Sequence, residues 1–348
     1  MNLYTRSLVA LSFLFLAACQ QAVRPNHDDS SAVPAPTVGQ ETPPPAPEVL
    51  PPPVVVEPSL PAPVVIAEPV PDPTYGLGEE VFARLRAGLE PGACDAGGDI
   101  ARRWRQRFAA NPTGFSHLLE SVLPLMDYVS RQVEQEQLPA EFALIPLIES
   151  GYKPSAIGQG GPAGLWQMIP STARNHGIVI HAGYDGRLSP IESTRAALSY
   201  LNTLRVMMGP WPATVMAYNA GENRVRAAIA RSPGADLTAG KHHPHGLNDV
   251  TYEYVGKLQA LSCLIVDSER AGIPLPLQTR FERMQELPVD ADVTSLDQFA
   301  KRRGIDAKSL RELNPAYKGG RVVTGAPRRV LVPASAINTT TTPSSTLP

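Results

Sequence analysis

A proline-rich stretch constrains this chain more than any other feature. Sixteen of its 37 prolines lie between Pro25 and Pro73, and that stretch carries seven acidic residues and no Lys or Arg. Because proline fixes φ and lacks an amide proton, the stretch favours extended polyproline II chain over a packed core. About 275 of the 348 residues remain for folding, which is enough for one or two domains.

The charge pattern excludes several classes of protein. Residues 74–295 hold 20 Lys and Arg against 23 Asp and Glu, whereas residues 296–333 hold 9 against 3. Neither segment has the charge density of a nucleic-acid-binding domain, and the sequence contains no glycine-rich phosphate loop. The composition also excludes collagen, a coiled coil and a protein with several membrane spans. We therefore expect no nucleic-acid partner.

The N-terminus resembles the signal peptide of a bacterial lipoprotein. Arg6 precedes an apolar run that is too short to span a bilayer and ends in Leu16-Ala17-Ala18-Cys19, the pattern of a lipobox. The resemblance implies removal of residues 1–18 and acylation of Cys19. Because of their proline content, residues 19–75 are expected to form a disordered tether. Gln20 replaces the acidic residue that retains many lipoproteins at the inner membrane. We expect an outer-membrane lipoprotein anchored by lipid on the periplasmic face; a soluble secreted protein is the alternative.

Two further cysteines, Cys94 and Cys263, remain once Cys19 is lipidated. An oxidising compartment and an even count allow a disulfide between them. Cys263 also lies in an apolar helical run, residues 258–266, which favours a buried thiol equally. Both interpretations stay open, because separation along the sequence says nothing of the distance between two Cα atoms.

Helical periodicity dominates residues 76–275 and predicts a mainly α domain. The most apolar segment, residues 139–149, predicts a buried helix that ends near Glu149 and is kinked at Pro146. Residues 151–164 are rich in glycine, so we expect a loop or a small hairpin there.

Start signals and apolar runs place further helices. Ser189-Pro190-Ile191-Glu192 has the features of a capping box with proline at the first helical position, and the helix it begins runs to Met207. Other helices are expected over residues 213–218, 222–230 and 252–266.

A second, smaller α/β unit is predicted at residues 286–334, after a polar junction around residues 278–290. Two short helices are expected there between short strands, the last of them at residues 330–333. The tail, residues 335–348, is rich in Thr and Ser and is expected to be disordered.

Glu149 is the candidate catalytic residue. It ends the most hydrophobic helical segment, and a carboxyl in apolar surroundings has a raised pKa because desolvation penalises its charged form. Such an acid stays protonated near neutral pH and can donate its proton to a leaving oxygen. The alternative is a helix-terminal glutamate that points into solvent.

Neutral polar and aromatic residues accompany this acid. Gln167 and Trp166 follow a glycine-rich turn, Tyr218 and Asn219 end another apolar helix, and Tyr252 and Tyr254 follow on a third. Hydrogen-bonding groups without charge, together with aromatic platforms, suit an uncharged sugar chain. For the tyrosines the alternative is an ordinary core position with a satisfied hydroxyl.

These motifs, in this order, resemble the lytic transglycosylase domain of glycoside hydrolase family 23. The resemblance covers roughly residues 80–270 and rests on Glu149-Ser150, Gly164-Leu165-Trp166-Gln167 and Ala217-Tyr218-Asn219. Asn111-Pro112 and Pro170-Ser171-Thr172-Ala173 support it. It implies a lysozyme-like fold that acts on the glycan strands of peptidoglycan and needs no cofactor or metal.

The resemblance also implies the chemistry and the residue roles. Glu149 would protonate the oxygen between MurNAc and GlcNAc, the substrate's N-acetyl group would stabilise C1, and Glu149 would then deprotonate the C6 hydroxyl. The product would be 1,6-anhydro-MurNAc, formed without a second carboxylate. Gln167, Tyr218 and Asn219 would bind substrate or shape the site, and Tyr254 would hydrogen-bond Glu149. Ser150 would belong to the same substrate-binding set in a supporting position.

One residue departs from the family pattern, and the C-terminal unit resembles a second family. Nine residues after its acid the family commonly has a serine, whereas this chain has Gly158. Residues 286–334 resemble a degenerate LysM module, since Leu313-Asn314-Pro315 fits but the usual Gly-Asp start is absent. Glycan binding and a capping role without carbohydrate affinity are both open for that module.

Three hypotheses follow. The first is a lytic transglycosylase, the second a hydrolytic muramidase on the same fold, and the third a murein-binding structural lipoprotein with an inactive site. A histidine tract, residues 241–245, has a proline inside it and no nearby carboxylate, so we expect an exposed loop there and no metal site.

Overall fold

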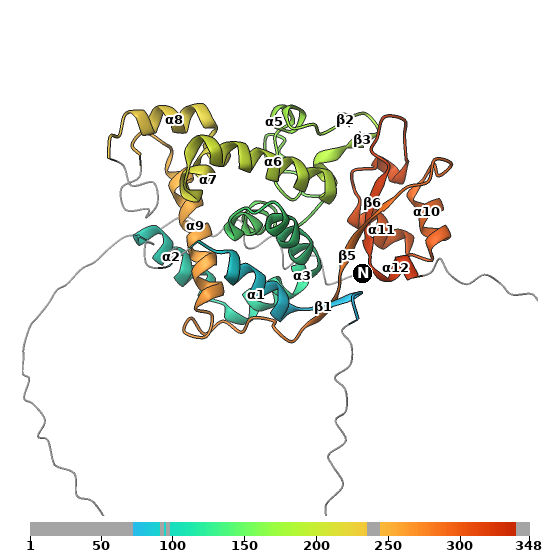
Figure 1. The fold of residues 1–348 in the computed structure, drawn as a ribbon, viewed down its shortest axis with the longest axis horizontal. Coiled ribbons are helices and arrows are strands. Elements are labelled where there is room, and N and C mark those ends of the chain that lie inside the picture. The colour runs from blue at the N-terminus through green and yellow to red at the C-terminus, as the bar shows by residue number, and fades with distance from the viewer. Residues whose placement is uncertain (1–71, 91–93, 95–97, 235–243, 339–348) are drawn as a thin grey trace, which may run out of the picture. The chain divides into compact units, whose positions relative to one another are not determined.

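Helices form most of the folded chain, and short antiparallel strand pairs connect its segments (Figure 1). The computed structural model describes residues 72–90, 94, 98–234 and 244–338. The helices up to residue 266 are α1 (Gly78–Gly88), α2 (Asp99–Ala109), α3 (Pro112–Gln135), η2 (Ala140–Leu144, a 3-10 helix), α4 (Ile145–Glu149), α5 (Pro170–Asn175), η3 (Gly186–Leu188), α6 (Pro190–Met208), α7 (Trp211–Ala220), α8 (Glu222–Ala230) and α9 (Asp249–Val266). The prediction of a mainly helical domain is confirmed.

Capping residues begin two of the long helices, and the start of α6 lies where the sequence predicts it. The Ser189 hydroxyl accepts a hydrogen bond from the amide of Glu192 (3.2 Å), so α6 starts at Pro190. Asn111 caps α3 in the same way through the amide of Gly114 (3.0 Å). The predicted bounds of α8 are confirmed, whereas α7 and α9 begin two and three residues earlier than expected.

The segment that carries Glu149 is not the single helix we predicted. Residues 140–144 form a 3-10 helix and residues 145–149 a separate α-helix of little more than one turn. Pro146 lies in the first turn of α4, where its missing amide proton costs nothing, and a continuous helix through it would lose a backbone hydrogen bond. The break allows Phe142, Ile145 and their neighbours to enter the core together.

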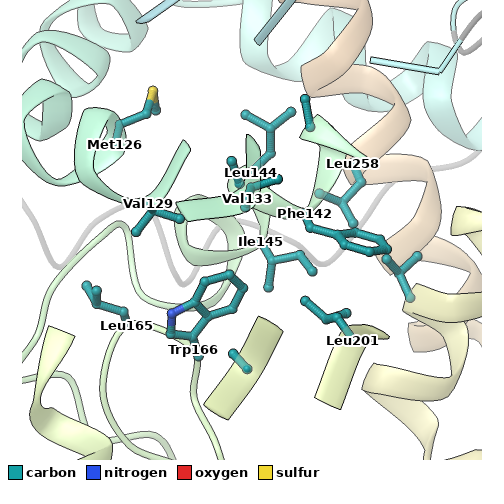
Figure 2. Close-up of a cluster of buried hydrophobic side chains, with 14 of the residues drawn as sticks. Met126, Val129, Val133, Phe142, Leu144, Ile145, Leu165, Trp166, Leu201 and Leu258 are labelled. Atoms are coloured by element: carbon teal, nitrogen blue, oxygen red, sulfur yellow. The ribbon is translucent and has the colours of Figure 1, made fainter. Parts of the chain in front are cut away.

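That core surrounds the short α4 helix (Figure 2). Phe142, Leu144 and Ile145 are fully buried, and Trp166 lies below them in the view, between side chains of α3 and α6. Fully burying an apolar side chain of this size contributes about 1.5–3 kcal/mol relative to exposure. The backbone at the end of α4 is thus fixed by the most apolar part of the protein.

The C-terminal unit has the two predicted helices between short strands. It consists of β5 (Met284–Pro288), α10 (Leu296–Arg303), α11 (Ala307–Leu313), η4 (Lys318–Gly320), β6 (Arg329–Pro333) and α12 (Ser335–Asn338). β5 pairs antiparallel with β6, with Glu286 opposite Leu331. The Asn314 side chain links the end of α11 to β6. It accepts a hydrogen bond from the Leu331 amide and donates one to the Leu331 carbonyl oxygen, both at 2.8 Å.

Several predicted boundaries in these regions are wrong. Residues 278–290 hold β4 (Arg280–Glu282) and all of β5 rather than a polar junction, because β4 pairs with β1 (Tyr75–Leu77), which precedes the first helix. Tyr75 therefore belongs to the fold and not to the tether. Residues 335–338 of the predicted disordered tail form α12, with Ala336 buried among the apolar residues of the unit.

Other sequence predictions lie outside the described residues. They concern the signal peptide (1–18), Cys19, the tether up to residue 71, the histidines at 242 and 243, and residues 339–348. In the part of the chain that the structure describes, no helix is long and apolar enough to cross a bilayer. Within the same ranges, His, Cys, Asp and Glu side chains form no group of three or more that could hold a metal ion.

The two cysteines for which a disulfide and a buried thiol are both open lie close together in the described structure. Cys263 is buried on α9. A hydrogen bond between the two side chains and burial raise the pKa of Cys263. Because the thiols are neighbours, the disulfide between them stays a prediction.

The C-terminal unit shares its apolar interior with the helical part of the chain. Leu331 of β6 is fully buried in the large helical core, and Tyr184 of β3 (Tyr184–Asp185) is buried among the apolar residues of the C-terminal unit. The ring of Tyr184 meets the ring of Tyr317 edge-on, with centroids 5.0 Å apart. Glu286 accepts hydrogen bonds from Tyr128 of α3 (2.9 Å) and Arg195 of α6 (2.6 Å). The unit is therefore packed onto the helices, not joined to them by a flexible link.

Candidate active site

Glu149 is the last residue of α4 and is half-buried. Burial raises the pKa of its carboxyl to about 7, because a charged carboxylate loses its hydration there. A hydrogen bond from Tyr254 and the positive charge of Lys257 lower the pKa, but desolvation is the larger effect. The side chain can therefore hold or release a proton near neutral pH.

Tyr254 and Lys257 approach Glu149 from α9. The Tyr254 hydroxyl donates a hydrogen bond to Oε1 of Glu149 at 2.8 Å, as the family resemblance implies. Tyr254 is buried, and burial together with the neighbouring carboxyl raises its own pKa, so it stays a neutral donor. The Lys257 ammonium lies 4.5 Å from the centre of the Trp104 ring, and desolvation lowers its pKa.

The hydroxyl of Tyr218 contacts the backbone of Trp166 at another side of the site. Its hydroxyl donates to the carbonyl oxygen of Trp166 at 2.8 Å, and the Glu149 carboxyl contributes to the raised pKa of this tyrosine. The hydroxyl is thus engaged with the protein, and the role of Tyr218 in shaping the site stays a prediction.

A row of rings leads from Tyr218 into a cleft. Tyr218 lies 5.7 Å from Tyr200 and Tyr200 lies 4.7 Å from His176, measured between ring centroids. Tyr200 and His176 line a cleft of about 620 Å³ between α5, α6 and the start of α8. Sequence analysis missed both rings, because they belong to helices that meet only in the folded chain.

Gln167 occupies a strained turn beside Gly158. Its φ of +46° lies in the left-handed region that side chains rarely adopt. Its side-chain amide donates to the carbonyl oxygens of Gly164 (2.8 Å) and Ala156 (3.3 Å). A Cβ atom at Gly158 would lie 2.5 Å from Oε1 of Gln167, so the glycine that departs from the family pattern makes room for this side chain.

Asn219 and Ser150 differ in what they offer a ligand. Asn219 is exposed, and its Oδ1 accepts a hydrogen bond from the Thr251 hydroxyl at 3.0 Å. The Ser150 hydroxyl donates to the backbone oxygens of Leu165 (2.9 Å) and Pro146 (3.2 Å). The Ser150 hydroxyl thus joins α4 to the loop that carries Gln167, and its supporting position in the substrate-binding set stays a prediction.

Two aromatic residues do not act as exposed platforms. Trp166 is fully buried in the core, and its indole nitrogen donates to Thr194 at 3.1 Å (Figure 2). Tyr252 donates to the carbonyl oxygen of Pro244 and so holds the segment before α9. The sequence could not distinguish these positions from ligand-binding ones, because both kinds follow glycine-rich or polar segments.

Lys257 is a candidate site residue that sequence analysis missed. It lies three residues after Tyr254, and this spacing places both side chains on one face of α9. Helical spacing from Tyr254 would have found it.

Comparison with known protein families decides the nature of this part of the chain. Residues 129–238 match the family described as Transglycosylase SLT domain. The chain carries an SLT domain. Residues 283–347 match the family described as Lytic transglycosylase MltD, LysM-like domain. The predicted family and the mainly helical fold class are confirmed by these matches.

Curated relatives match most of the SLT-domain chain. Membrane-bound lytic murein transglycosylase D of Escherichia coli strain K12 is 32% identical over 240 residues, which cover 68% of this chain and 52% of the relative. The protein of the same name from Escherichia coli O6:H1 matches to the same extent. The chain thus spans about half the length of these relatives.

Solved structures are more distant. The 70 kDa soluble lytic transglycosylase of Escherichia coli is 22% identical, and the match covers 58% of this chain and 31% of that one with a TM-score of 0.37. An inactive mutant of lytic transglycosylase Slt from Pseudomonas aeruginosa is 21% identical over 44% of this chain and 26% of its own, with a TM-score of 0.34.

The SLT family match, residues 129–238, includes Glu149, Gln167, Tyr218 and Asn219, whereas Tyr254 and Lys257 lie beyond it.

Replacing Glu149 with glutamine should stabilise the protein in a pH-dependent way. The unfolded carboxyl ionises near 4.5 and the folded one near 7, so the wild type loses stability as the pH rises between these values. The difference between these two pKa values corresponds to about 3 kcal/mol of unfolding free energy, and a glutamine side chain does not have this loss. Urea denaturation should therefore show that the free energy of unfolding of Glu149→Gln, relative to that of the wild type, increases by about 3 kcal/mol from pH 4.5 to 7. Above pH 7 this difference should stay constant.

A Glu149→Gln advantage in the free energy of unfolding that does not change with pH would contradict the assigned pKa.

Proposed function

We propose that this protein is a lytic transglycosylase that cleaves the β-1,4 bond between MurNAc and GlcNAc in peptidoglycan. The observation that carries the proposal is the half-buried Glu149, with a pKa of about 7 and a hydrogen bond from Tyr254, inside the matched SLT domain. The names of the curated relatives support the same substrate.

Glu149 first acts as the acid. It donates its proton to the glycosidic oxygen, which leaves as the hydroxyl of GlcNAc, while positive charge develops at C1 of MurNAc. The acetamido oxygen of the substrate stabilises that charge. Lys257 is the charged residue that perturbs the pKa of Glu149, and no carboxylate of the described residues does so. This supports a mechanism in which the substrate takes the place of a second carboxylate.

Glu149 then acts as the base. Its carboxylate removes the proton from the C6 hydroxyl of the same MurNAc, and O6 forms a bond with C1. The product is 1,6-anhydro-MurNAc, no water is consumed, and the acid is regenerated with its proton. The hydrogen bond from Tyr254 and the charge of Lys257 stabilise the carboxylate between these two steps.

The surrounding residues have supporting roles. We assign Asn219, which is exposed beside Tyr218, to hydrogen bonds with the sugar chain, and Gln167 to the wall of the site. Residues 76–275 would form the catalytic domain and residues 286–334 the LysM-like module, with β5 beginning at Met284.

We also propose that the chain is a lipoprotein of the outer membrane that faces the periplasm. Cys19 follows the lipobox pattern, and the curated relatives are named membrane-bound. Acylation at Cys19 and the proline-rich stretch would let an anchored enzyme reach peptidoglycan at a distance from the bilayer.

The Glu149→Gln variant should lose glycan cleavage. Glutamine keeps the size of the side chain but cannot donate the proton, so turnover of purified sacculi should fall by roughly 10²–10⁴-fold. Mass spectrometry of the released muropeptides should find anhydro ends in the wild type. Ends heavier by one water would instead identify a hydrolytic muramidase, and no release would identify a structural protein.

Glu141→Gln is the matched control. Glu141 is a second buried glutamate whose pKa burial raises to about 7, and its Oε1 accepts a hydrogen bond from the amide of Glu90. Its replacement should leave cleavage within about twofold of the wild type. Equal losses in both variants, or wild-type cleavage by Glu149→Gln, would refute the assigned role.

The Cys19→Ser variant tests the anchor. Without the thiol, the chain should incorporate no radiolabelled palmitate in cells and should be absent from the outer-membrane fraction. Cys263→Ser should keep both properties. Outer-membrane localisation of the Cys19→Ser protein with unchanged acylation would contradict the proposal.

A further inference from the structure

A buried ion pair lies next to the active-site loop. Arg187 donates from Nε to Oδ1 of Asp185 (3.0 Å) and from Nη2 to Oδ2 (2.8 Å), which makes a two-point contact. Their side chains are 10% and 9% exposed. A buried pair of this kind often adds little net stability, so its contacts with the loop are the more informative feature.

Arg187 holds both ends of the loop that carries Gln167. Its Nη1 donates to the carbonyl oxygens of Gly161 (2.7 Å) and Met168 (3.2 Å). The backbone of Arg187 also touches the loop, since a Cβ atom at Gly164 would lie 1.7 Å from the Arg187 carbonyl oxygen. With a φ of +80°, only glycine fits that position well. The guanidinium and its backbone thus fix the loop at three points.

The same loop positions the groups around the catalytic acid. The carbonyl oxygen of Leu165 accepts from Ser150, the neighbour of Glu149, and that of Trp166 accepts from Tyr218. A displacement of the loop would therefore move the end of α4 and the ring of Tyr218 relative to each other.

The C-terminal unit holds the segment from which Arg187 extends. The amide of Asp185 donates to the carbonyl oxygen of Ala316 (3.0 Å), and the amide of Lys318 donates to that of Gly183 (3.2 Å). Between these bonds, Tyr184 is buried against Tyr317. Residues 183–187 therefore connect the C-terminal unit to the active-site loop.

We propose that Arg187, fixed by Asp185, is a positioning residue for the reaction at Glu149. The C-terminal unit would act on cleavage through this pair, by holding residues 183–185 in place. The inference rests on the proposed function, because it assigns a role in that reaction, and it makes the LysM-like unit a structural part of the active site.

The test compares Asp185→Asn with a matched control in the full chain. Asp127→Asn also removes the charge of a buried aspartate, one that bonds Arg84, Arg131 and Arg283. Both variants should lose stability, so they are compared at a temperature at which circular dichroism reports both as folded. Asp185→Asn should lower kcat on soluble glycan strands at least tenfold with KM within about twofold, since small misplacements are costly. Asp127→Asn should keep kcat within about twofold.

Hydrogen exchange provides a readout that does not depend on cleavage. The amides of Gly158, Gly164 and Met168 donate to loop carbonyl oxygens. In Asp185→Asn they should exchange at least tenfold faster, and in Asp127→Asn at the wild-type rate. Unchanged exchange in Asp185→Asn would overturn the inference whether or not the wild type cleaves glycan. Absence of wild-type cleavage would refute the proposed function alone.

The Arg187→Lys variant keeps the inference testable if Asp185→Asn does not fold. A lysine can pair with Asp185, but its single ammonium cannot also bridge the carbonyl oxygens of Gly161 and Met168. The variant should therefore fold, exchange its loop amides at least tenfold faster and lower kcat at least tenfold. Wild-type exchange and kcat in Arg187→Lys would overturn the inference.

Discussion

The proposed active site depends on the cost of burying the carboxyl of Glu149. Desolvation raises its pKa, the hydrogen bond from Tyr254 and the charge of Lys257 lower it, and the result is a group that titrates near neutral pH. This balance requires α4 to end at one place in an apolar core. The break of the helix before Pro146 and the buried Phe142 and Ile145 provide that place (Figure 2). A carboxyl in this setting can act as an acid and then as a base.

Around this acid the protein uses backbone contacts more than charged side chains. Ser150 and Tyr218 both donate to carbonyl oxygens of one loop, and Arg187 holds the ends of that loop. The C-terminal unit reaches the same loop through Tyr184, so the two parts of the fold share an interior. A module that resembles a separable binding domain is therefore built into the catalytic part, and this explains why β5 begins inside the predicted junction.

Local sequence signals predicted the structural features that depend on interactions between residues close together in the sequence. The cap at Ser189, the bounds of α8 and the apolar segment before Glu149 follow from periodicity and start signals, and the structure has them. The buried state of Trp166 and the proximity of Lys257 to Glu149 depend on contacts between distant segments. The pairing of β1 with β4 joins residues about 200 apart, so no local pattern could have moved Tyr75 from the tether into the fold. The Asp185–Arg187 pair was missed because its proposed role depends on the loop that Arg187 contacts in the folded chain.

The most direct test of this account is the titration of the Glu149 carboxyl itself. Isotope-edited infrared spectroscopy of protein labelled with ¹³C-glutamate can follow the protonated carbonyl band, and subtraction of the Glu149→Gln spectrum assigns it. The Glu141→Gln background removes a second glutamate whose pKa burial raises to about 7. The account predicts a midpoint near pH 7 for Glu149. A midpoint near 4.5, the value of a solvated glutamate, would contradict it.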